Sequence, residues 1–370
     1  GIITPQNHFV DPKEYFDEFL NLVRANNVTP VHTTFIYLRS ISPTTFLTKG
    51  KFEEVKKLCI EHEIEEVILS EQISSHQESV LQKELHANIF DRTQLILEIF
   101  EKRAQSAEAK LQIKIAFLEF KKTRVAGKGK SLSQQGGGIG TRGKGETQKE
   151  IDLQHIDHLL VKLDSDLKKL SLVRQTQRKR RIKNKVFTIS LIGYTNAGKT
   201  TLFNAMTKSS NYVEDLLFAT LDTTITQTII GRQKVVVSDT VGFIQNLPHQ
   251  LVESFKSTLE ELQYANVILH VVDVANKSWQ NNVRTVLKVL EELDVDTSKE
   301  LYVFNKIDRL TEEELQNTIP HLPKPFVLIS AQDKQSLTSL YEYLDQVIIE
   351  NKPKQEHDYV WESDLDDVSE

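Results

Sequence analysis

The chain has 370 residues and a mass of 42.4 kDa, more than one packed core usually holds, so at least two domains are expected. Hydrophobic residues make up 39% and charged residues 26%, a globular composition, and no apolar run reaches the roughly 18 residues of a transmembrane helix. The one cysteine, Cys59, excludes an internal disulfide and a cysteine-based zinc site, and no secretory signal is recognisable. These features predict a protein without a membrane span, located in the cytoplasm or, as the alternative, in an organelle. We expect it to be a monomer.

The net charge of -6 hides a strongly basic segment. Residues 101–185 contain 22 Lys and Arg against 9 Asp and Glu, whereas residues 351–370 contain 2 against 7. A single basic segment in an otherwise acidic chain indicates contact with a local polyanion rather than general adhesion to acidic surfaces.

Residues 1–90 are predicted to form a small α/β domain. Strand-like stretches occur at 31–38, 67–69 and 88–90, with polar amphipathic segments beside them. No internal repeat is evident along the chain.

The segment 91–182 carries two narrow apolar seams at helical spacing. The first runs from Ile96 to Leu118 and predicts one long helix that begins at the cap residue Asp91. The second runs from Leu153 to Leu170, on the other side of a Gly-rich break at 127–145. Two seams of similar length around such a break predict an antiparallel helical hairpin with a basic, Gly-rich loop.

Strand-like runs alternate with helical patterns between 186 and 350. This alternation completes a predicted α/β fold: a small N-terminal α/β domain with a long antiparallel helical hairpin, then a doubly wound, mostly parallel sheet. The acidic end, 351–370, has no apolar period and is predicted to be a flexible tail. Strands of the sheet are predicted at 186–192, 227–230, 235–237, 267–274, 301–304 and 326–329.

The sequence at 193–200 reads GYTNAGKT and matches the phosphate-loop pattern G-x-x-x-x-G-K-[ST]. It follows an apolar strand and begins an amphipathic helix, a context in which backbone N–H groups can face phosphate oxygens. Lys199 is expected to reach the β- and γ-phosphates, and the Thr200 hydroxyl to bind Mg²⁺. The predicted nucleotide contacts of this segment are Gly193, Tyr194, Thr195, Asn196, Ala197, Gly198, Lys199, Thr200 and Thr201.

A guanine-recognition motif, NKID, stands at 305–308 directly after a predicted strand. The Asp308 carboxylate can accept hydrogen bonds from the N1–H and the N2 amine of guanine, which adenine does not offer. The sheet is therefore predicted to be a P-loop GTPase domain. The other predicted contacts with the base are Asn305, Lys306, Ser330 and Ala331.

The sequence at 239–242 is DTVG, at the end of another predicted strand. Asp239 is expected to hold Mg²⁺ through water and the Gly242 N–H to contact the γ-phosphate, with Thr240 and Val241 between them in the nucleotide site. Phe243 follows, where many small GTPases carry a glutamine that orients the attacking water. Charge stabilisation must therefore come from another group.

Asn196 offers one source of that stabilisation. An asparagine at this place of a phosphate loop can help to coordinate K⁺ beside the phosphates, and the alternative is that Asn196 only forms the turn. Lys199, Asn196 and Gly242 make up the predicted catalytic set.

A second metal-binding threonine is expected between the phosphate-loop helix and the edge strand. The sequence FATLDTT at 218–224 ends in two threonines, and spacing does not separate them. We take Thr224 as the candidate, beside Thr200 and Asp239.

Basic side chains gather at both ends of the hairpin, on the glycine backbone of its tip and in the last turns of its second helix. Neutralising several phosphates gives strong, salt-dependent affinity, and folded RNA is recognised mostly through shape and backbone. The alternative is a linker with a solvated helix face. The predicted RNA contacts are Lys128, Lys130, Arg142, Lys144, Arg178, Lys179, Arg180 and Arg181.

The chain resembles the HflX family of ribosome-associated GTPases in three stretches. They read DRTQLILEIF at 91–100, GGGIGTRGKGE at 136–146, and FATLD at 218–222 with DTVGFI at 239–244. The resemblance implies an N-terminal α/β domain with a helical hairpin, a GTPase domain, and binding to the large ribosomal subunit. It further implies splitting of ribosomes or rescue of stalled or idle ones.

The chain departs from the family pattern at two positions. Thr223 stands where the family usually has proline, and no basic residue follows within the next few positions; Lys144 stands where proline is frequent. For some members the resemblance also implies hydrolysis of ATP through the N-terminal domain. Residues 1–185 of this chain contain no phosphate loop, which argues against that activity here.

Two other functions fit the same motifs. An RNA-processing or tRNA-modification GTPase would use the nucleotide to gate another catalytic activity, for which no second set of catalytic residues is visible. A nucleotide-gated scaffold with negligible turnover is the reading that Phe243 suggests. The ribosome-binding GTPase is the function that the motifs and the basic hairpin favour together.

Overall fold

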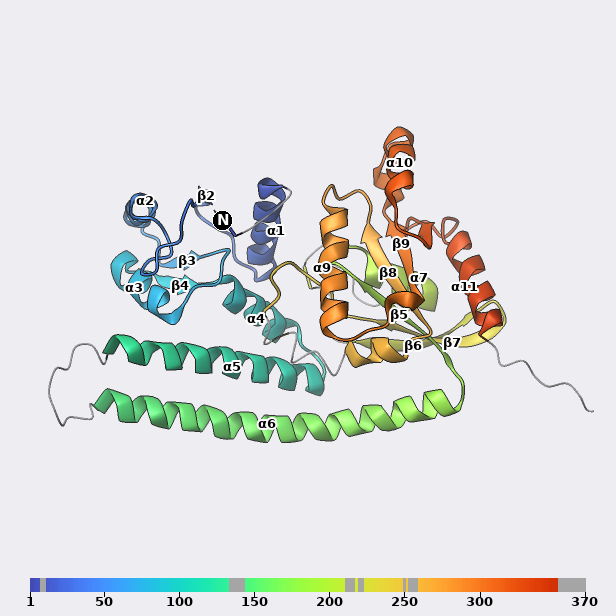
Figure 1. Ribbon diagram of the computed structural model, residues 1–370, viewed down its shortest axis with the longest axis horizontal. Helices are drawn as coiled ribbons and strands as arrows, with labels where there is room; N and C mark the ends of the chain where they lie inside the picture. Colours follow the sequence, from blue (N-terminus) through green and yellow to red (C-terminus); the bar gives the residue numbers. More distant parts are fainter. Residues whose placement is uncertain are drawn as a thin grey trace, which may run out of the picture.

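The computed structural model describes residues 1–6, 11–132, 144–209, 217–218, 223–248, 251 and 259–351, with the backbone alone at 128–132, 144–148, 177 and 260. Three parts follow one another along the chain: a small N-terminal subdomain, a pair of long helices, and a six-stranded α/β domain (Figure 1). The described helices include none that is both long and apolar enough to cross a membrane.

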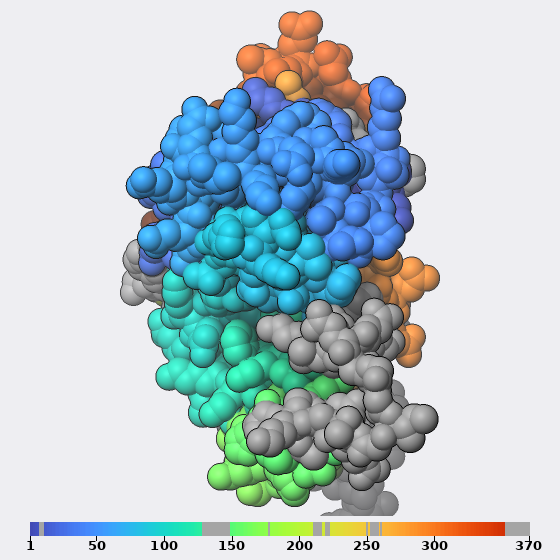
Figure 2. All heavy atoms as spheres, turned by 90° about the vertical axis from the view of Figure 1, so that its left-hand side faces the viewer, coloured from blue at the N-terminus to red at the C-terminus, as the bar shows by residue number. Residues whose placement is uncertain are grey.

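The N-terminal subdomain consists of two short parallel strand pairs, β1 with β2 and β3 with β4, and the helices around them. The N–H of Ile2 donates to Ser70 Oγ at 2.8 Å, just beyond β3, and so ties the two pairs together. Figure 2 shows this end of the molecule, with the subdomain above the ends of the long helices. The elements are β1 (Ile2–Ile3), α1 (Pro12–Ala25), β2 (Ile36–Tyr37), α2 (Lys49–Glu61), β3 (Glu66–Ile68), α3 (Ser75–Leu85) and β4 (Asn88–Phe90).

The predicted strands of this subdomain are partly right. The strand expected at 88–90 is confirmed, the one at 67–69 is shifted by one residue, and the one at 31–38 is reduced to two residues. The two-residue strand β1 was not predicted, because so short a strand leaves no alternation in the sequence.

The prediction of one long helix from Ile96 to Leu118 is wrong. Helix α4 (Arg92–Arg103) ends at Ala104, which is extended with φ −62° and ψ 121°, and α5 (Ala107–Leu132) begins after a short turn. The predicted cap is confirmed, since Asp91 Oδ1 accepts the N–H of Gln94 at 2.9 Å. The apolar spacing continues across the turn, so the pattern alone could not show the break.

Helix α6 (Lys144–Lys183) lies antiparallel to α5 and passes beneath both of the other parts, which confirms the helical hairpin (Figure 1). The Gly-rich break is shorter than predicted, because α5 continues past Gly127 to Leu132. A Cβ at Gly127 would lie 2.4 Å from Ser75 Oγ, so this glycine permits the close approach of α5 to α3. The loop tip, 133–143, lies outside the described residues.

The α/β domain has the strand order β10-β9-β8-β5-β7-β6, parallel except for the edge strand β6. This confirms the doubly wound, mostly parallel sheet. Helices α7 and α11 pack on one face, and α9 on the other. The elements are β5 (Phe187–Gly193), α7 (Lys199–Thr207), β6 (Thr224–Ile230), β7 (Gln233–Asp239), η2 (Glu260–Tyr264), β8 (Val267–Asp273), α9 (Trp279–Glu292), η3 (Thr297–Lys299), β9 (Glu300–Asn305), η4 (Ile307–Arg309), α10 (Glu312–Thr318), η5 (Ile319–His321), β10 (Phe326–Leu328) and α11 (Thr338–Glu350).

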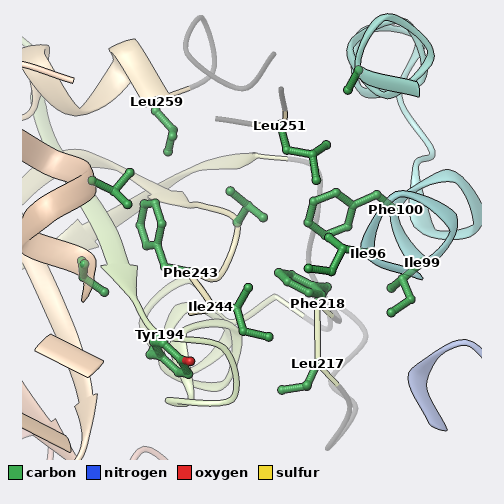
Figure 3. Packing of buried hydrophobic residues seen from close by; sticks show 14 of the residues in the cluster. Ile96, Ile99, Phe100, Tyr194, Leu217, Phe218, Phe243, Ile244, Leu251 and Leu259 are labelled. Carbon is green, nitrogen blue, oxygen red and sulfur yellow. The ribbon is translucent and has the colours of Figure 1, made fainter. Parts of the chain in front are cut away.

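One hydrophobic core spans the N-terminal subdomain, the hairpin and the α/β domain. Ile96 and Phe100 of α4 are completely buried in it, together with Phe243 of the α/β domain (Figure 3). The ring of Phe218 lies edge-on to that of Phe100, with centroids 4.5 Å apart. The hydrophobic effect therefore holds the three parts together as one packed body.

Candidate active site

The phosphate loop connects β5 to α7 and requires glycine at two positions. Gly193 has φ 150°, and a Cβ there would lie 2.2 Å from the carbonyl oxygen of Val271. Gly198 has φ 95°, and a Cβ there would lie 2.2 Å from Asn305 Nδ2. Both glycines are therefore needed for backbone conformation and for close contact with β8 and β9.

Lys199 opens helix α7 and points its ammonium into the loop. Its Nζ donates to the carbonyl oxygens of Gly193 at 3.1 Å and of Tyr194 at 2.8 Å. A Cβ added at Gly242 would lie 3.1 Å from this ammonium, so the D-x-x-G segment lies against it. Burial lowers the pKa of Lys199 to about 8, with opposition from Asp239.

Thr200 and Asp239 meet at the entrance to the same helix. Thr200 Oγ1 donates to Asp239 Oδ2 at 2.8 Å, and the other oxygen, Oδ1, is buried with no hydrogen-bond partner among the described residues. Burial raises the pKa of Asp239 to about 6. Hydroxyl and carboxylate oxygens are ligands that Mg²⁺ prefers, and Asp239 Oδ1 is the oxygen without a described partner. These two residues therefore fit that ion.

Thr224 is the first residue of β6 and lies opposite Asp239 in the strand register. The hydroxyl of the neighbouring Thr223 is buried and, within the part of the chain described, has no hydrogen-bond partner. Both threonines therefore lie beside the strand that ends in Asp239, the carboxylate predicted to bind Mg²⁺, and Thr224 remains the predicted ligand.

The guanine motif is joined to the phosphate loop by Asn305. Its Nδ2 donates to the carbonyl oxygen of Ala197 at 2.8 Å, and its Oδ1 accepts the N–H of Ala331 at 2.8 Å. The buried Ser330, next to Ala331, is fixed by its backbone N–H, which donates to a serine hydroxyl six residues further on. Asp308 lies in η4 and is exposed.

Lys306 lies across the phosphate loop. Its Nζ donates to the carbonyl oxygen of Asn196 at 2.7 Å and pairs with Asp273 Oδ2 at 2.7 Å. Asp273, at the carboxyl end of β8, was not predicted as part of the site; an acidic residue directly after a buried apolar strand was the available signal.

Asn196 has φ 60°, an αL conformation that asparagine adopts more readily than most residues, and it is exposed. This backbone geometry fits the turn-forming role. The K⁺ role of its side chain stays a prediction.

Of the D-x-x-G residues, the middle two face the protein interior. Thr240 Oγ1 donates to the carbonyl oxygen of Leu191 at 2.7 Å, and Val241 is buried in the shared core. Phe243 is likewise buried at 1% exposure, which removes it from the nucleotide side. Thr240 and Val241 are therefore expected to contact nucleotide only through their backbone. Thr201, the last predicted contact of the phosphate loop, is half-buried on α7.

Two of the predicted RNA contacts have a different position from the one expected. Arg178 is buried, with its guanidinium 4.4 Å from the centre of the Tyr264 ring, and pairs with Glu261 at 3.7 Å. Arg181 Nη2 donates to both carboxylate oxygens of Glu261, at 3.0 and 2.8 Å. These arginines attach α6 to the α/β domain, so the exposed position expected for them is wrong, and RNA contact by either stays a prediction.

The remaining basic positions stay open to solvent or lie outside the described side chains. Lys179 and Arg180 are exposed on α6. The backbone of Lys128 and Lys130 is in α5 and that of Lys144 in α6, without a described side chain, and Arg142 lies outside the described residues.

Three family models match the chain in succession. A model described as GTP-binding GTPase N-terminal matches 13–101, and one described as GTP-binding GTPase Middle Region matches 103–181. A third, described as 50S ribosome-binding GTPase, matches 188–306. The three segments coincide with the subdomain, the hairpin and most of the α/β domain.

Curated proteins named GTPase HflX are similar over most of the chain. The protein from Caldanaerobacter subterraneus is 42% identical over 310 residues, which cover 83% of this chain and 71% of the relative. The Escherichia coli protein is 38% identical over 343 residues, covering 92% and 81%. Among solved structures, a GTP-binding protein from Sulfolobus solfataricus in complex with GDP is 24% identical, with a TM-score of 0.47 and coverage of 92% and 97%.

Proposed function

This chain belongs to the HflX family of GTPases, and we propose from that premise that it docks on the large ribosomal subunit in its GTP state and promotes subunit splitting or rescue of stalled or idle ribosomes. Membership of the family makes the chain a GTP-hydrolysing enzyme of the ribosome-binding class. The proposal that it splits or rescues ribosomes rests on how the hairpin joins the nucleotide domain.

The observation that carries the proposal is the attachment of α6 to the α/β domain. Arg181, in the last turn of α6, pairs with Glu261 of η2, which is the next helical element after the D-x-x-G segment within the described residues and leads into β8. At its other end α6 reaches the basic, Gly-rich loop. The segment near the γ-phosphate is therefore connected, along the chain and through this ion pair, to α6. The other end of α6 begins at the basic loop that is predicted to contact RNA.

For GTP binding, the loop glycines and the backbone N–H groups cradle the phosphates, and Lys199 neutralises the β- and γ-phosphates. Asp308 selects guanine. Mg²⁺, when bound, would be held by Thr200, Asp239 and a threonine before or at the start of β6, and would supply charge neutralisation on the phosphates.

Hydrolysis is an in-line attack of water on the γ-phosphate, with GDP as the leaving group. In this proposal the Gly242 N–H contacts the γ-phosphate, and Phe243 cannot orient the water. We assign the missing charge stabilisation to K⁺ held with the help of Asn196, which predicts faster turnover in K⁺ than in Na⁺. Loss of the γ-phosphate then releases the segments that contact it, and with them the hairpin from the ribosome.

The test is a sucrose-gradient assay on purified ribosomes with this protein and GTP. We expect free large and small subunits to accumulate with GTP and not with GDP, and Lys199→Ala to remove the effect. Intact ribosomes in both nucleotide states, together with co-purifying tRNA, would instead support a tRNA-modification GTPase.

A further inference from the structure

Three side chains and the backbone of one further residue form a hydrogen-bonded ring between the N-terminal subdomain and the nucleotide site. Arg92 Nη2 donates to Glu18 Oε1 at 2.8 Å and to the carbonyl oxygen of Gln245 at 3.0 Å. The N–H of Gln245 donates to the Tyr194 hydroxyl at 2.9 Å, and that hydroxyl donates to Glu18 Oε2. Two members come from helices α1 and α4, one from the phosphate loop, and one from the segment after D-x-x-G.

The ring is almost fully withdrawn from solvent. The Arg92 side chain is 3% exposed and that of Glu18 16%, and the guanidinium lies 5.3 Å from the centre of the Tyr15 ring. Burial and the neighbouring Glu18 raise the pKa of Tyr194 well above its usual value, so the phenol keeps the proton that it donates. Charge-assisted bonds in such surroundings are stronger and more specific in geometry than exposed ones.

The ring continues a backbone connection between the phosphate loop and Phe243. The N–H of Thr195 donates to the carbonyl oxygen of Phe243 at 2.7 Å, and the N–H of Phe243 donates to the carbonyl oxygen of Gly193 at 3.1 Å. Tyr194 and Phe243 thus form a parallel bridge, with Gly242 directly before it and Gln245 two residues after it. Fixing Gln245 therefore fixes the backbone near Gly242, which lies against the ammonium of Lys199.

Helix α4 also contacts Phe218, which precedes the two threonines of the predicted metal site in the chain. Phe100 packs edge-on against Phe218, at the start of the segment that leads to Thr223 and Thr224 (Figure 3). One helix outside the GTPase domain therefore contacts residues near both segments that are expected to sense the γ-phosphate: Gln245 through Arg92, and Phe218 through Phe100.

We infer that Arg92 is a positioning residue for GTP hydrolysis: through Glu18, Tyr194 and Gln245 it holds the Gly242 backbone in place for the γ-phosphate, so the N-terminal subdomain is part of the GTPase active site. This role goes beyond ribosome binding and does not depend on it. GDP lacks the group that Gly242 contacts, so the ring acts on the triphosphate state alone.

Arg92→Met tests this with the purified full chain and no ribosomes, by affinities for GDP and for a non-hydrolysable GTP analogue and by steady-state hydrolysis. Coupling between two sites is typically 5- to 150-fold, so we expect the affinity for the analogue and kcat each to fall by about tenfold. The GDP affinity is expected to change by less than about twofold, since GDP lacks the γ-phosphate that Gly242 is expected to contact. Tyr194→Phe, which removes only the hydroxyl, should lower the same two quantities in a protein that folds.

Arg124→Met is the matched control. Arg124 is also an ion-paired arginine that lies over an aromatic ring, and it is half-buried, but its partners Asp91 and Glu78 belong to the N-terminal part of the chain. It should lower the melting temperature as Arg92→Met does, with the ratio of the two affinities unchanged. The inference is overturned if Arg92→Met and Tyr194→Phe keep the wild-type ratio and kcat, or if either binds the analogue more tightly.

Discussion

Arg181 and Glu261 form a two-point contact in which both carboxylate oxygens accept from one guanidinium nitrogen, at 3.0 and 2.8 Å. The two residues lie 80 positions apart, one at the end of α6 and the other in η2. Arg178 reinforces the contact by stacking on Tyr264 of the same short helix. The end of the hairpin nearest the sheet is therefore fixed, and the basic residues that stay exposed beside it are free for other partners.

The first prediction separates the two neighbouring arginines. Arg181→Ala should lower the free energy of unfolding by about 1–3 kcal/mol, because Glu261 is left half-paired in a mostly buried position. Arg180→Ala should change it by less than about 0.5 kcal/mol, as expected for an exposed side chain. Denaturant unfolding of both variants measures this difference.

Binding to ribosomal RNA should respond in the opposite way. Arg180→Ala is expected to weaken large-subunit binding and to reduce its dependence on salt, whereas Arg181→Ala should act on binding only through the position of α6. Equal losses of stability in the two variants would contradict the assignment.

The second prediction concerns base choice. Asp308→Asn replaces two acceptor oxygens with one acceptor and one donor, so it should weaken GTP binding by at least about tenfold and improve binding of xanthosine triphosphate, which carries an oxygen at position 2. Competition of the two nucleotides in a hydrolysis assay measures the switch. Asp294→Asn, on an exposed turn after α9, should leave the preference for guanine intact.

The third prediction is a bell-shaped pH profile. Nucleotide and metal binding need Asp239 ionised and Lys199 protonated, and burial places their pKa values at about 6 and about 8 in the free protein. The kcat/KM for GTP should therefore fall as the pH drops through about 6, where Asp239 gains a proton, and as it rises through about 8, where Lys199 loses one.

Bound phosphates favour the ammonium form of Lys199, so the upper limb should move to higher pH in the profile of kcat. Steady-state rates at constant ionic strength between pH 5 and 9.5 give both profiles. A flat kcat/KM over this range would show that neither group limits binding.

The fourth prediction compares two glycines in helices. Gly127→Ala places a methyl group 2.4 Å from Ser75 Oγ and 2.7 Å from its Cβ, so it should destabilise the fold by about 1–3 kcal/mol. At Gly50 of α2 a Cβ would meet nothing within 4 Å, and alanine there should stabilise by up to about 1 kcal/mol. Melting temperatures that move in the same direction would argue against the close packing of α5 on α3.

The phosphate loop, the guanine motif and the alternation of strands and helices could all be predicted from the sequence. Each depends on a contiguous run of residues: Gly193 and Gly198 permit local backbone conformations, and buried strands such as β8 are mostly apolar. Local geometry of this kind is written in neighbouring residues, so the motif predicts the arrangement.

The remaining features depend on residues far apart in the chain. No residue near Arg178 in the sequence indicates that Glu261 and Tyr264 cover it. The basic run at 178–181 therefore predicted an exposed surface. Ala104, where the helix breaks, is buried in the shared core, and the contact of Glu18 with Tyr194 joins residues 176 positions apart. Tertiary contacts decide these cases, and local pattern does not record them.

The most direct test of the account is co-sedimentation of the protein with purified ribosomes and separated subunits, loaded with GDP or with a non-hydrolysable GTP analogue. We predict binding to the large subunit that needs the triphosphate, falls with added salt, and weakens in Arg142→Ala or Lys144→Ala but not in Lys299→Ala, an exposed lysine on the α/β domain. No sedimentation with the large subunit in either nucleotide state, or equal binding in both, would contradict it.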